Sequence, residues 1–387
     1  MGRLIAVYIA FVMLVGGAFV WFLTALLSPE DAARPTQAMA SETVMAQTSE
    51  RAPLDLSALE PSPLPLSMPL DCDPGVDCWP LKYVDLDPTK GRRDYQCGAM
   101  TVDGHKGVDF AIADPRRLNR DEVPVLAAAT GKVVGIRDEM PDVNIRIAGK
   151  ESLKGRDCGN GVRIDHGGGW ASQYCHMKRG SVSVKAGDTV VSGDRLGLVG
   201  LSGSTEFLHL HVQFEKDGKV VDPFVGLGGK EGACGIGAAP LWQKSVLQKV
   251  RYSAPLIQAV GIAGEAPDTL GVSDGKFTDA PVKPDAPLLV LWADLYGLRK
   301  GDRVSMRFTG ADGAVLAETD WVQDKNQLRT FKYIGKKARK DWPSGRRPAS
   351  VNSGPARDIC SPSSSTIRPS ALSKAALVSG VSQLISL

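Results

Sequence analysis

The sequence predicts a mainly β protein, in which a compact antiparallel β-sheet or barrel-like domain is followed by a small β-sandwich-like domain. Two observations support this fold class. The chain of 387 residues contains 42 Gly and 25 Pro, which favours short strands joined by turns over long helices. Runs of alternating or β-branched residues, bounded by Gly, Asp or Asn, also recur along two stretches of the chain. The predicted exception is an N-terminal transmembrane helix.

Residues 1–28 are predicted to be a signal anchor. Residues 4–27 are predominantly apolar and carry no charge, and a run of this length can cross a bilayer as a helix. A cleaved signal peptide is the alternative, because the Ala-Met-Ala sequence at 38–40 resembles a cleavage site, although it lies well downstream. Arg3 precedes the run and Glu30 follows it, and this order of charges predicts export of the remainder of the chain.

Residues 29–70 are rich in Ala, Pro, Ser and Thr without a sustained apolar period, and they predict a flexible linker. Residues 71–228 are predicted to form the first β domain. Its strand-like stretches, each with Gly-containing turns, are 123–136, 159–177, 181–200 and 209–223. The polar insertion at 138–157 predicts a long surface loop at the rim of a site.

A second β-rich domain is predicted over residues 240–335. Its strand-length runs are 287–297, 303–310, 314–322 and 328–335. The region contains no His, so we expect no catalytic part in it. The tail at 336–387 has no clear strand or helix pattern and is predicted to be disordered. One hypothesis for its composition is a shifted reading frame.

The chain contains seven cysteines, and six of them lie between Cys72 and Cys234. No Cys-x-x-Cys pair occurs, so structural disulfides in an oxidising compartment explain them better than a Cys-ligated zinc site. Six cysteines allow fifteen pairings, and the sequence does not determine which forms. We predict Cys158–Cys175 first, because these residues lie on successive strands expected to pair, and Cys72–Cys78 next.

The net charge of +3 is small, and no dense run of Lys and Arg is present. Proteins that bind nucleic acid usually concentrate positive charge along one stripe or patch. Nucleic acid is therefore not an expected partner.

All five histidines lie between His105 and His211. In the sequence Gly-His-Lys-Gly-Val-Asp-Phe, strand geometry would put His105 and Asp109 on one face, with Gly107 leaving space between them. In His-Leu-His-Val, His209 and His211 share a face in the same way. Taken alone, the first motif fits a turn His beside a solvated Asp.

His176 closes the Gln-Tyr-Cys-His-Met sequence just before a predicted turn. Taken alone, it fits a hydrogen-bonded or exposed histidine. Catalytic zinc commonly takes three protein ligands, and two His with one carboxylate fit that pattern. The clustering of the three motifs therefore favours a catalytic metal site with further histidines available for proton transfer.

The order His-x-Gly-x-Asp, then Tyr-x-His-Met, then His-Leu-His resembles the lysostaphin/LytM-type zinc metallopeptidases. The segments Gly-Asn-Gly-Val-Arg-Ile-Asp-His-Gly and Val-Lys-Ala-Gly-Asp also resemble that family. The resemblance covers residues 97–224, about a third of the chain. It implies that His105, Asp109 and His211 bind one Zn²⁺ and that His176 and His209 are catalytic. His166 matches a family position that we interpret as structural.

One departure from the family pattern lies just before His-Leu-His. Many members have a small Ser/Thr-Gly-Pro-type turn there, whereas this chain has Glu206, Phe207 and Leu208. The departure predicts a reshaped wall of the cleft.

The resemblance implies hydrolysis of peptide cross-links in bacterial peptidoglycan by metal-activated water with histidine acid/base assistance. The alternative is a catalytically silent wall-binding protein that regulates a cell-wall amidase. The expected partners are peptidoglycan and, through the N-terminal helix, the inner membrane. The C-terminal domain is interpreted as a contact for division or cell-wall proteins. The expected location is the periplasmic side of the inner membrane, or the periplasm if the N-terminal segment is cleaved.

Overall fold

The computed structural model describes residues 54–120, 123–230, 232–278, 280, 282–283, 285–309 and 315–337, and the backbone of 357–358, 374–378 and 381–386. The predicted transmembrane span at 1–28 lies outside these residues. Among the described residues, none of the helices combines the length and apolar character needed to cross a bilayer.

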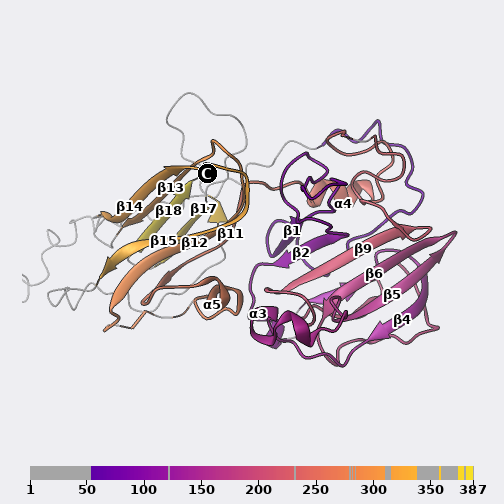
Figure 1. Cartoon of the computed structure of the whole chain (residues 1–387), viewed down its shortest axis with the longest axis horizontal. Helices are drawn as coiled ribbons and strands as arrows, with labels where there is room; N and C mark the ends of the chain where they lie inside the picture. The colour runs from indigo at the N-terminus through magenta and orange to yellow at the C-terminus, as the bar shows by residue number, and fades with distance from the viewer. Residues whose placement is uncertain are drawn as a thin grey trace, which may run out of the picture. The chain divides into compact units, whose positions relative to one another are not determined.

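An antiparallel sheet of eight strands organises the first half of the described chain (Figure 1). Its order is β1-β2-β9-β6-β5-β4-β7, and β10 pairs with β9. The strands are β1 (Cys78–Lys82), β2 (Val108–Ile112), β4 (Gly131–Arg137), β5 (Asn160–Gly167), β6 (Trp170–Met177), β7 (Thr189–Val190), β9 (His209–Lys216) and β10 (Lys219–Val220). A separate two-stranded sheet joins β3 (Pro124–Leu126) to β8 (Arg195–Leu198). The protein is thus mainly β in this region, as predicted.

Alternation along the central strands separates a core face from a polar face. Leu210 and Val212 of β9 are fully buried, as is Phe110 of β2. These side chains belong to one hydrophobic cluster with Tyr174 and Trp242. Residues i and i+2 of a strand share a face, so the intervening residues of β2 and β9 point to the opposite side of the sheet.

The C-terminal end of the predicted linker is part of this core. Leu66 and Leu70 are buried within the hydrophobic cluster. The backbone N–H of Leu66 donates to the carbonyl of Leu241, and that of Ser67 donates to Ala128. Residues 54–70 are therefore ordered against the domain rather than flexible, and the rest of the predicted linker lies outside the described residues.

The predicted surface loop at 138–157 also contains regular structure. It includes α3 (Ile145–Ala148) and η2 (Lys150–Ser152), and the side chains of Met140, Ile145 and Leu153 form a small buried cluster. The remaining short helices are α2 (Arg117–Arg120), α4 (Lys244–Lys249) and α5 (Thr269–Ser273).

The C-terminal region contains two sheets. One has the order β11-β12-β15 and the other β14-β13-β18-β17-β16. The strands are β11 (Leu256–Ala263), β12 (Leu288–Leu298), β13 (Arg303–Thr309), β14 (Val315–Val322), β15 (Gln327–Lys337), β16 (Arg357–Asp358), β17 (Lys374–Val378) and β18 (Val381–Ser386). Leu291 and Leu295 of β12 share a buried cluster with Val304 and Met306 of β13, which is the packing of a small sandwich.

The strands β16, β17 and β18 fall in the tail that the sequence predicted to be disordered. β18 pairs with β13, from Ser305 opposite Ser386 to Thr309 opposite Ser382. The structure differs from the prediction in these three segments, and the other residues beyond 337 lie outside the described part of the chain.

Candidate metal centre

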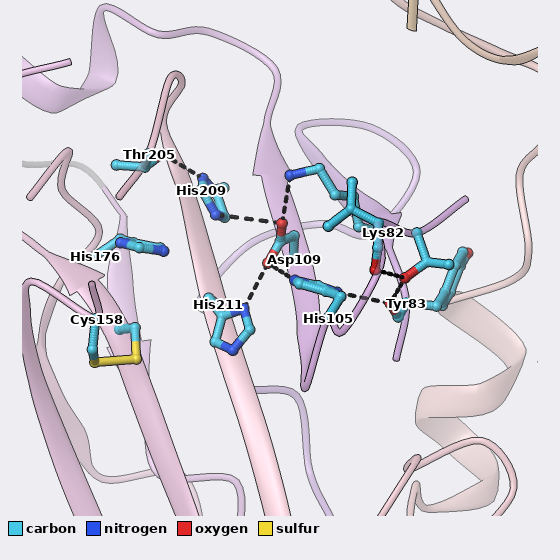
Figure 2. Close-up of polar contacts among 12 residues, drawn as sticks. Lys82, Tyr83, His105, Asp109, Cys158, His176, Thr205, His209 and His211 are labelled. Carbon is cyan, nitrogen blue, oxygen red and sulfur yellow. Dashed lines mark hydrogen bonds and ion pairs between the residues drawn. A yellow bond between two sulfur atoms is a disulfide. The ribbon is translucent and has the colours of Figure 1, made fainter. Parts of the chain in front are cut away.

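Two imidazole rings converge on one carboxylate oxygen, that of Asp109 (Figure 2). Nε2 of His105 lies 3.0 Å and Nδ1 of His211 lies 2.8 Å from Oδ1 of Asp109. One ligand atom from each residue lies within 4.8 Å of the others. The structure therefore brings together the three residues that the sequence predicted as ligands, and their role in binding zinc stays a prediction.

Strand pairing explains how two of these residues meet. Asp109 of β2 is directly opposite His211 of β9, and Ala111 is opposite His209. Directly opposed residues of antiparallel strands share a face, so the carboxylate and both imidazoles project to the polar side. The sequence pattern had suggested that His105 lies in the same strand as Asp109. The structure differs, because β2 begins at Val108 and His105 precedes it.

Gly107 leaves the space that this arrangement needs. A Cβ atom at this position would lie 2.5 Å from the carbonyl oxygen of Val212 and 2.6 Å from Nε2 of His211. Both distances are shorter than real Cβ contacts. The His-x-Gly-x-Asp motif therefore needs glycine at its centre.

Outer contacts hold two of the three side chains. Nδ1 of His105 donates to the carbonyl oxygen of Tyr83 at 2.7 Å. A carbonyl only accepts, so Nδ1 carries a proton, and Nε2 is the nitrogen that faces Asp109 and the ligand set. Oδ2 of Asp109 accepts from Nζ of Lys82 at 2.9 Å. Although burial opposes ionisation, the charges of Lys82 and His105 hold the pKa of Asp109 well below its usual range.

His209 lies beside this cluster and contacts the other oxygen of Asp109. Its Nε2 is 3.5 Å from Oδ2. Its Nδ1 lies 2.9 Å from the carbonyl oxygen of Phe207 and 3.1 Å from Oγ1 of Thr205. Burial lowers the pKa of His209 to about 4, so the ring is neutral at pH 7.

His176 approaches from β6. Its ring centroid is 4.8 Å from that of His209 and 6.1 Å from that of His211. Nδ1 lies 2.8 Å from the carbonyl oxygen of Ser202. Burial, together with the neighbouring His209 and His211, holds the pKa of His176 well below its usual value. Its backbone is left-handed, with φ 63°, which is uncommon for a residue other than glycine.

His166 has different partners. Its Nδ1 lies 2.9 Å from the carbonyl oxygen of Thr130, and its Nε2 lies 2.8 Å from Oγ of Ser172. Both ring nitrogens are thus used in bonds between neighbouring segments of the sheet. These contacts fit the structural role that the sequence suggested.

The insertion at 138–157 supports the loop that precedes β9. The side-chain amide of Asn144 donates to the carbonyl oxygen of Glu206 at 2.8 Å. The backbone N–H of Ile145 donates to the carbonyl oxygen of Thr205 at 2.9 Å. Since Thr205 and Phe207 both contact His209, the insertion helps to position a predicted catalytic residue. The sequence predicted that this insertion lies at the rim of a site, but it did not predict these particular contacts.

Three disulfides are present among the described residues. Cys158–Cys175 and Cys72–Cys78 confirm the two predicted pairs. The third, Cys97–Cys234, joins residues 137 positions apart and was not predicted. Cys72, Asp77 and Cys78 also have donor atoms close together, but the disulfide occupies both sulfurs, so this group is not a metal site.

The chemistry of the His–Asp–His group fits a catalytic divalent cation. Catalytic zinc commonly takes three protein ligands of imidazole and carboxylate type and keeps one position open. Here each of two imidazole nitrogens already contacts the same carboxylate oxygen, and the outer contacts of His105 and Asp109 hold those two side chains. The group could therefore hold one metal ion with little rearrangement.

Residues 103–223 match the model of peptidase family M23. This match confirms the resemblance to lysostaphin/LytM-type peptidases. Over 119 residues the chain is 31% identical to an uncharacterized metalloprotease of Haemophilus influenzae and 26% identical to one of Buchnera aphidicola. Each match covers 31% of this chain but only 20% and 25% of those proteins, respectively, so the chain spans a minor part of the relatives' length.

Solved structures with similarity include the catalytic domain of the prophage-encoded M23 protein EnpA from Enterococcus faecalis, with 24% identity and a TM-score of 0.25. That match covers 38% of this chain and 92% of the other. The catalytic domain of lysostaphin from Staphylococcus simulans shows 22% identity and a TM-score of 0.24, covering 38% and 89% of the two chains. These low TM-scores support no argument beyond the similarity itself.

Proposed function

We propose that this chain, whose residues 103–223 match peptidase family M23, is a zinc-dependent endopeptidase that hydrolyses peptide cross-links of bacterial peptidoglycan. The observation that carries the proposal is the convergence of His105, Asp109 and His211 beside two further buried histidines. The relatives named metalloproteases support peptidase activity, and the family resemblance supports the substrate.

The protein supplies the groups that hold such a reaction together. When bound, zinc would supply a Lewis acid that activates water and polarises a peptide carbonyl. The carbonyl oxygens of Ser202 and Phe207 accept hydrogen bonds from Nδ1–H of His176 and His209, respectively. Each neutral ring then keeps an unprotonated Nε2, which can accept a proton from water and later return it to the leaving amine.

The environment of both histidines suits this exchange. His176 and His209 are almost fully buried, and burial is the main cause of their lowered pKa values. Buried imidazoles interact with developing charge more strongly than exposed ones, because the local dielectric is lower. Once protonated, either ring can also donate a hydrogen bond to a developing oxyanion.

We place the protein on the periplasmic side of an inner membrane as part of the same proposal. The uncharged run at 4–27 supports an anchor or signal peptide. Disulfides persist in oxidising compartments, and the three pairs support export. The C-terminal sandwich is proposed to contact division or cell-wall proteins.

The test is incubation of the full chain with purified peptidoglycan, with and without a zinc chelator, followed by analysis of the released muropeptides. We expect release that stops with chelation and returns with added zinc. His105→Ala is the matched control, because it removes one predicted ligand. A zinc-loaded parent that binds wall material and releases nothing would exclude the enzyme and support the regulator of a cell-wall amidase.

A further inference from the structure

The two oxygens of Asp109 have different partners. Oδ1 faces the predicted ligand atoms of His105 and His211, at 3.0 and 2.8 Å. Oδ2 points away from them and accepts from Nζ of Lys82 at 2.9 Å, with Nε2 of His209 at 3.5 Å (Figure 2). The carboxylate therefore offers one oxygen to the ligand set while an ammonium group contacts the other.

Lys82 is held in place by the fold. It ends β1 and lies opposite Asp109 in the pairing of β1 with β2. The strand begins at Cys78, which the disulfide to Cys72 ties to the preceding turn. The side chain of Lys82 is only 18% exposed. Its backbone neighbour Tyr83 accepts the outer hydrogen bond of His105, so two consecutive residues contact two predicted ligands.

Phe207 covers the same ammonium group. Nζ of Lys82 lies 5.0 Å from the centroid of the Phe207 ring, in cation–π geometry. The ring also stacks on His209, with centroids 4.4 Å apart and planes at 24°. Phe207 thus contacts both groups that approach Oδ2 of Asp109. This is the position at which the sequence departs from the family pattern.

We propose that Lys82 is a positioning residue that restricts Asp109 to a single metal-facing oxygen, and that Phe207 keeps Lys82 there. The inference rests on the metal site of the proposed function, but Lys82 and Tyr83 lie outside the segment that matches the family model. Strand β1 then supports the metal centre through Lys82, which contacts a predicted ligand without binding the metal itself.

Because Lys82 is charged, we expect its removal to change metal affinity in the direction opposite to the usual one for an outer partner. A neutral outer partner usually strengthens a ligand, and its loss weakens metal binding. An ammonium group instead withdraws charge from the carboxylate and repels a cation on the other oxygen. Its removal should therefore tighten metal binding and free Oδ2 to become a second donor. A residue that only braced the fold would give the opposite result on removal.

The test compares Lys82→Met with the parent, using the full chain. Methionine keeps the length of the side chain and removes the charge. We expect zinc affinity, measured by competition with a chelator, to increase about tenfold, the lower end of the range for changes in outer partners. In the cobalt-substituted protein, visible absorption should weaken, because a second carboxylate oxygen raises the coordination number above four.

Two further variants make the comparison specific. Lys132→Met removes an equal charge from an exposed position on β4, which three strands separate from β2, and this variant should bind both ions as the parent does. Phe207→Leu removes the ring over Nζ while leaving Lys82 in place. It should shift affinity and absorption in the same direction as Lys82→Met, by a smaller factor.

The outcomes separate this inference from the proposed function. An affinity no tighter than that of the parent, or an unchanged cobalt spectrum, overturns the inference if Lys82→Met keeps the parent's melting temperature. If that variant does not fold, Phe207→Leu decides by the same two measurements. A parent that binds neither ion overturns both the metal site and the inference. A parent that binds zinc without hydrolysing peptidoglycan overturns the proposed activity alone.

Discussion

The carbonyl oxygen of Ser202 lies 2.8 Å from Nδ1 of His176 and so determines which ring nitrogen carries the proton. The backbone N–H of His176 donates to Cys158, and its carbonyl accepts from Gly200. Three hydrogen bonds therefore hold a residue whose backbone is left-handed. None of these three partners is a predicted metal ligand, so the position of His176 does not depend on the metal site.

His176→Ala should keep the metal and lose hydrolysis. The substitution removes a proton carrier without removing a predicted ligand, and such losses commonly cost about 10²–10⁴-fold in rate. His105→Ala should lose both the metal and the activity. Zinc content and muropeptide release are to be measured for both variants beside the parent. Loss of zinc from a folded His176→Ala protein would contradict the assignment.

Gly107→Ala should abolish metal binding. The new Cβ would meet both the carbonyl of Val212 and the ring of His211, which forces the imidazole away from Asp109. Overpacking of this kind typically costs about 1–3 kcal/mol of stability. Gly135→Ala on β4 is the matched control, since a Cβ there meets nothing within 4 Å. Zinc titration and urea unfolding of the two variants test the prediction, and equal zinc affinity in both would refute it.

The buried carboxyl of Asp222 should make the stability of the folded protein depend on pH. It is fully buried, and Oδ1 accepts from the backbone N–H groups of Phe224 and Val225, whereas Oδ2 has no hydrogen-bond partner in the described part of the chain. Burial raises the pKa of Asp222 from 3.8 to about 7. The folded state then retains a proton that the unfolded state has lost, so stability falls as pH rises from about 4 to 7.

Asp222→Asn should remove this loss, because the amide keeps the accepting oxygen and cannot ionise. We expect the variant to be more stable than the parent at pH 8, by at most about 4 kcal/mol, and to show no such gain at pH 4. Urea unfolding in the presence of a chelator measures the difference without a contribution from metal. A gain of equal size at both pH values would show that ionisation of Asp222 is not its cause.

The disulfides should differ in their contribution to stability. Loop closure entropy increases with the length of the loop, so replacing both Cys97 and Cys234 with Ser should cost about 5 kcal/mol. The same change at Cys72 and Cys78, which are six positions apart, should cost about 2 kcal/mol. Denaturant midpoints of the two double variants test this order, and the reverse order would show that strain or unfolded-state structure dominates.

The site residues were predictable because their signals are local. His209 and His211 alternate with core residues along one strand, and His105, Gly107 and Asp109 lie within five positions. The strand-like runs at 287–297 and 303–310 correspond closely to β12 and β13 for the same reason. The period of the hydrophobic pattern and the residues that form turns can both be recognised within a few positions, so a single sequence is enough to find them.

The contacts of Lys82 and Phe207 were not predictable in this way. Lys82 meets Asp109 through the register of β1 on β2, and Cys97 meets Cys234 across most of the domain. Such pairings depend on the closure of long loops, for which local composition carries no information. The sequence marked Phe207 as unusual but could not show that its ring contacts both Lys82 and His209.

The Cys97–Cys234 bond makes one covalent ring of the segment that contains every histidine of the protein. A protease that cuts once within this ring, for example at the exposed residues Lys150 or Glu151 of the insertion, opens the ring without releasing a fragment. The nicked protein would migrate as one species without reductant and as two with it. A single cleavage there would therefore leave the predicted metal ligands on one connected molecule.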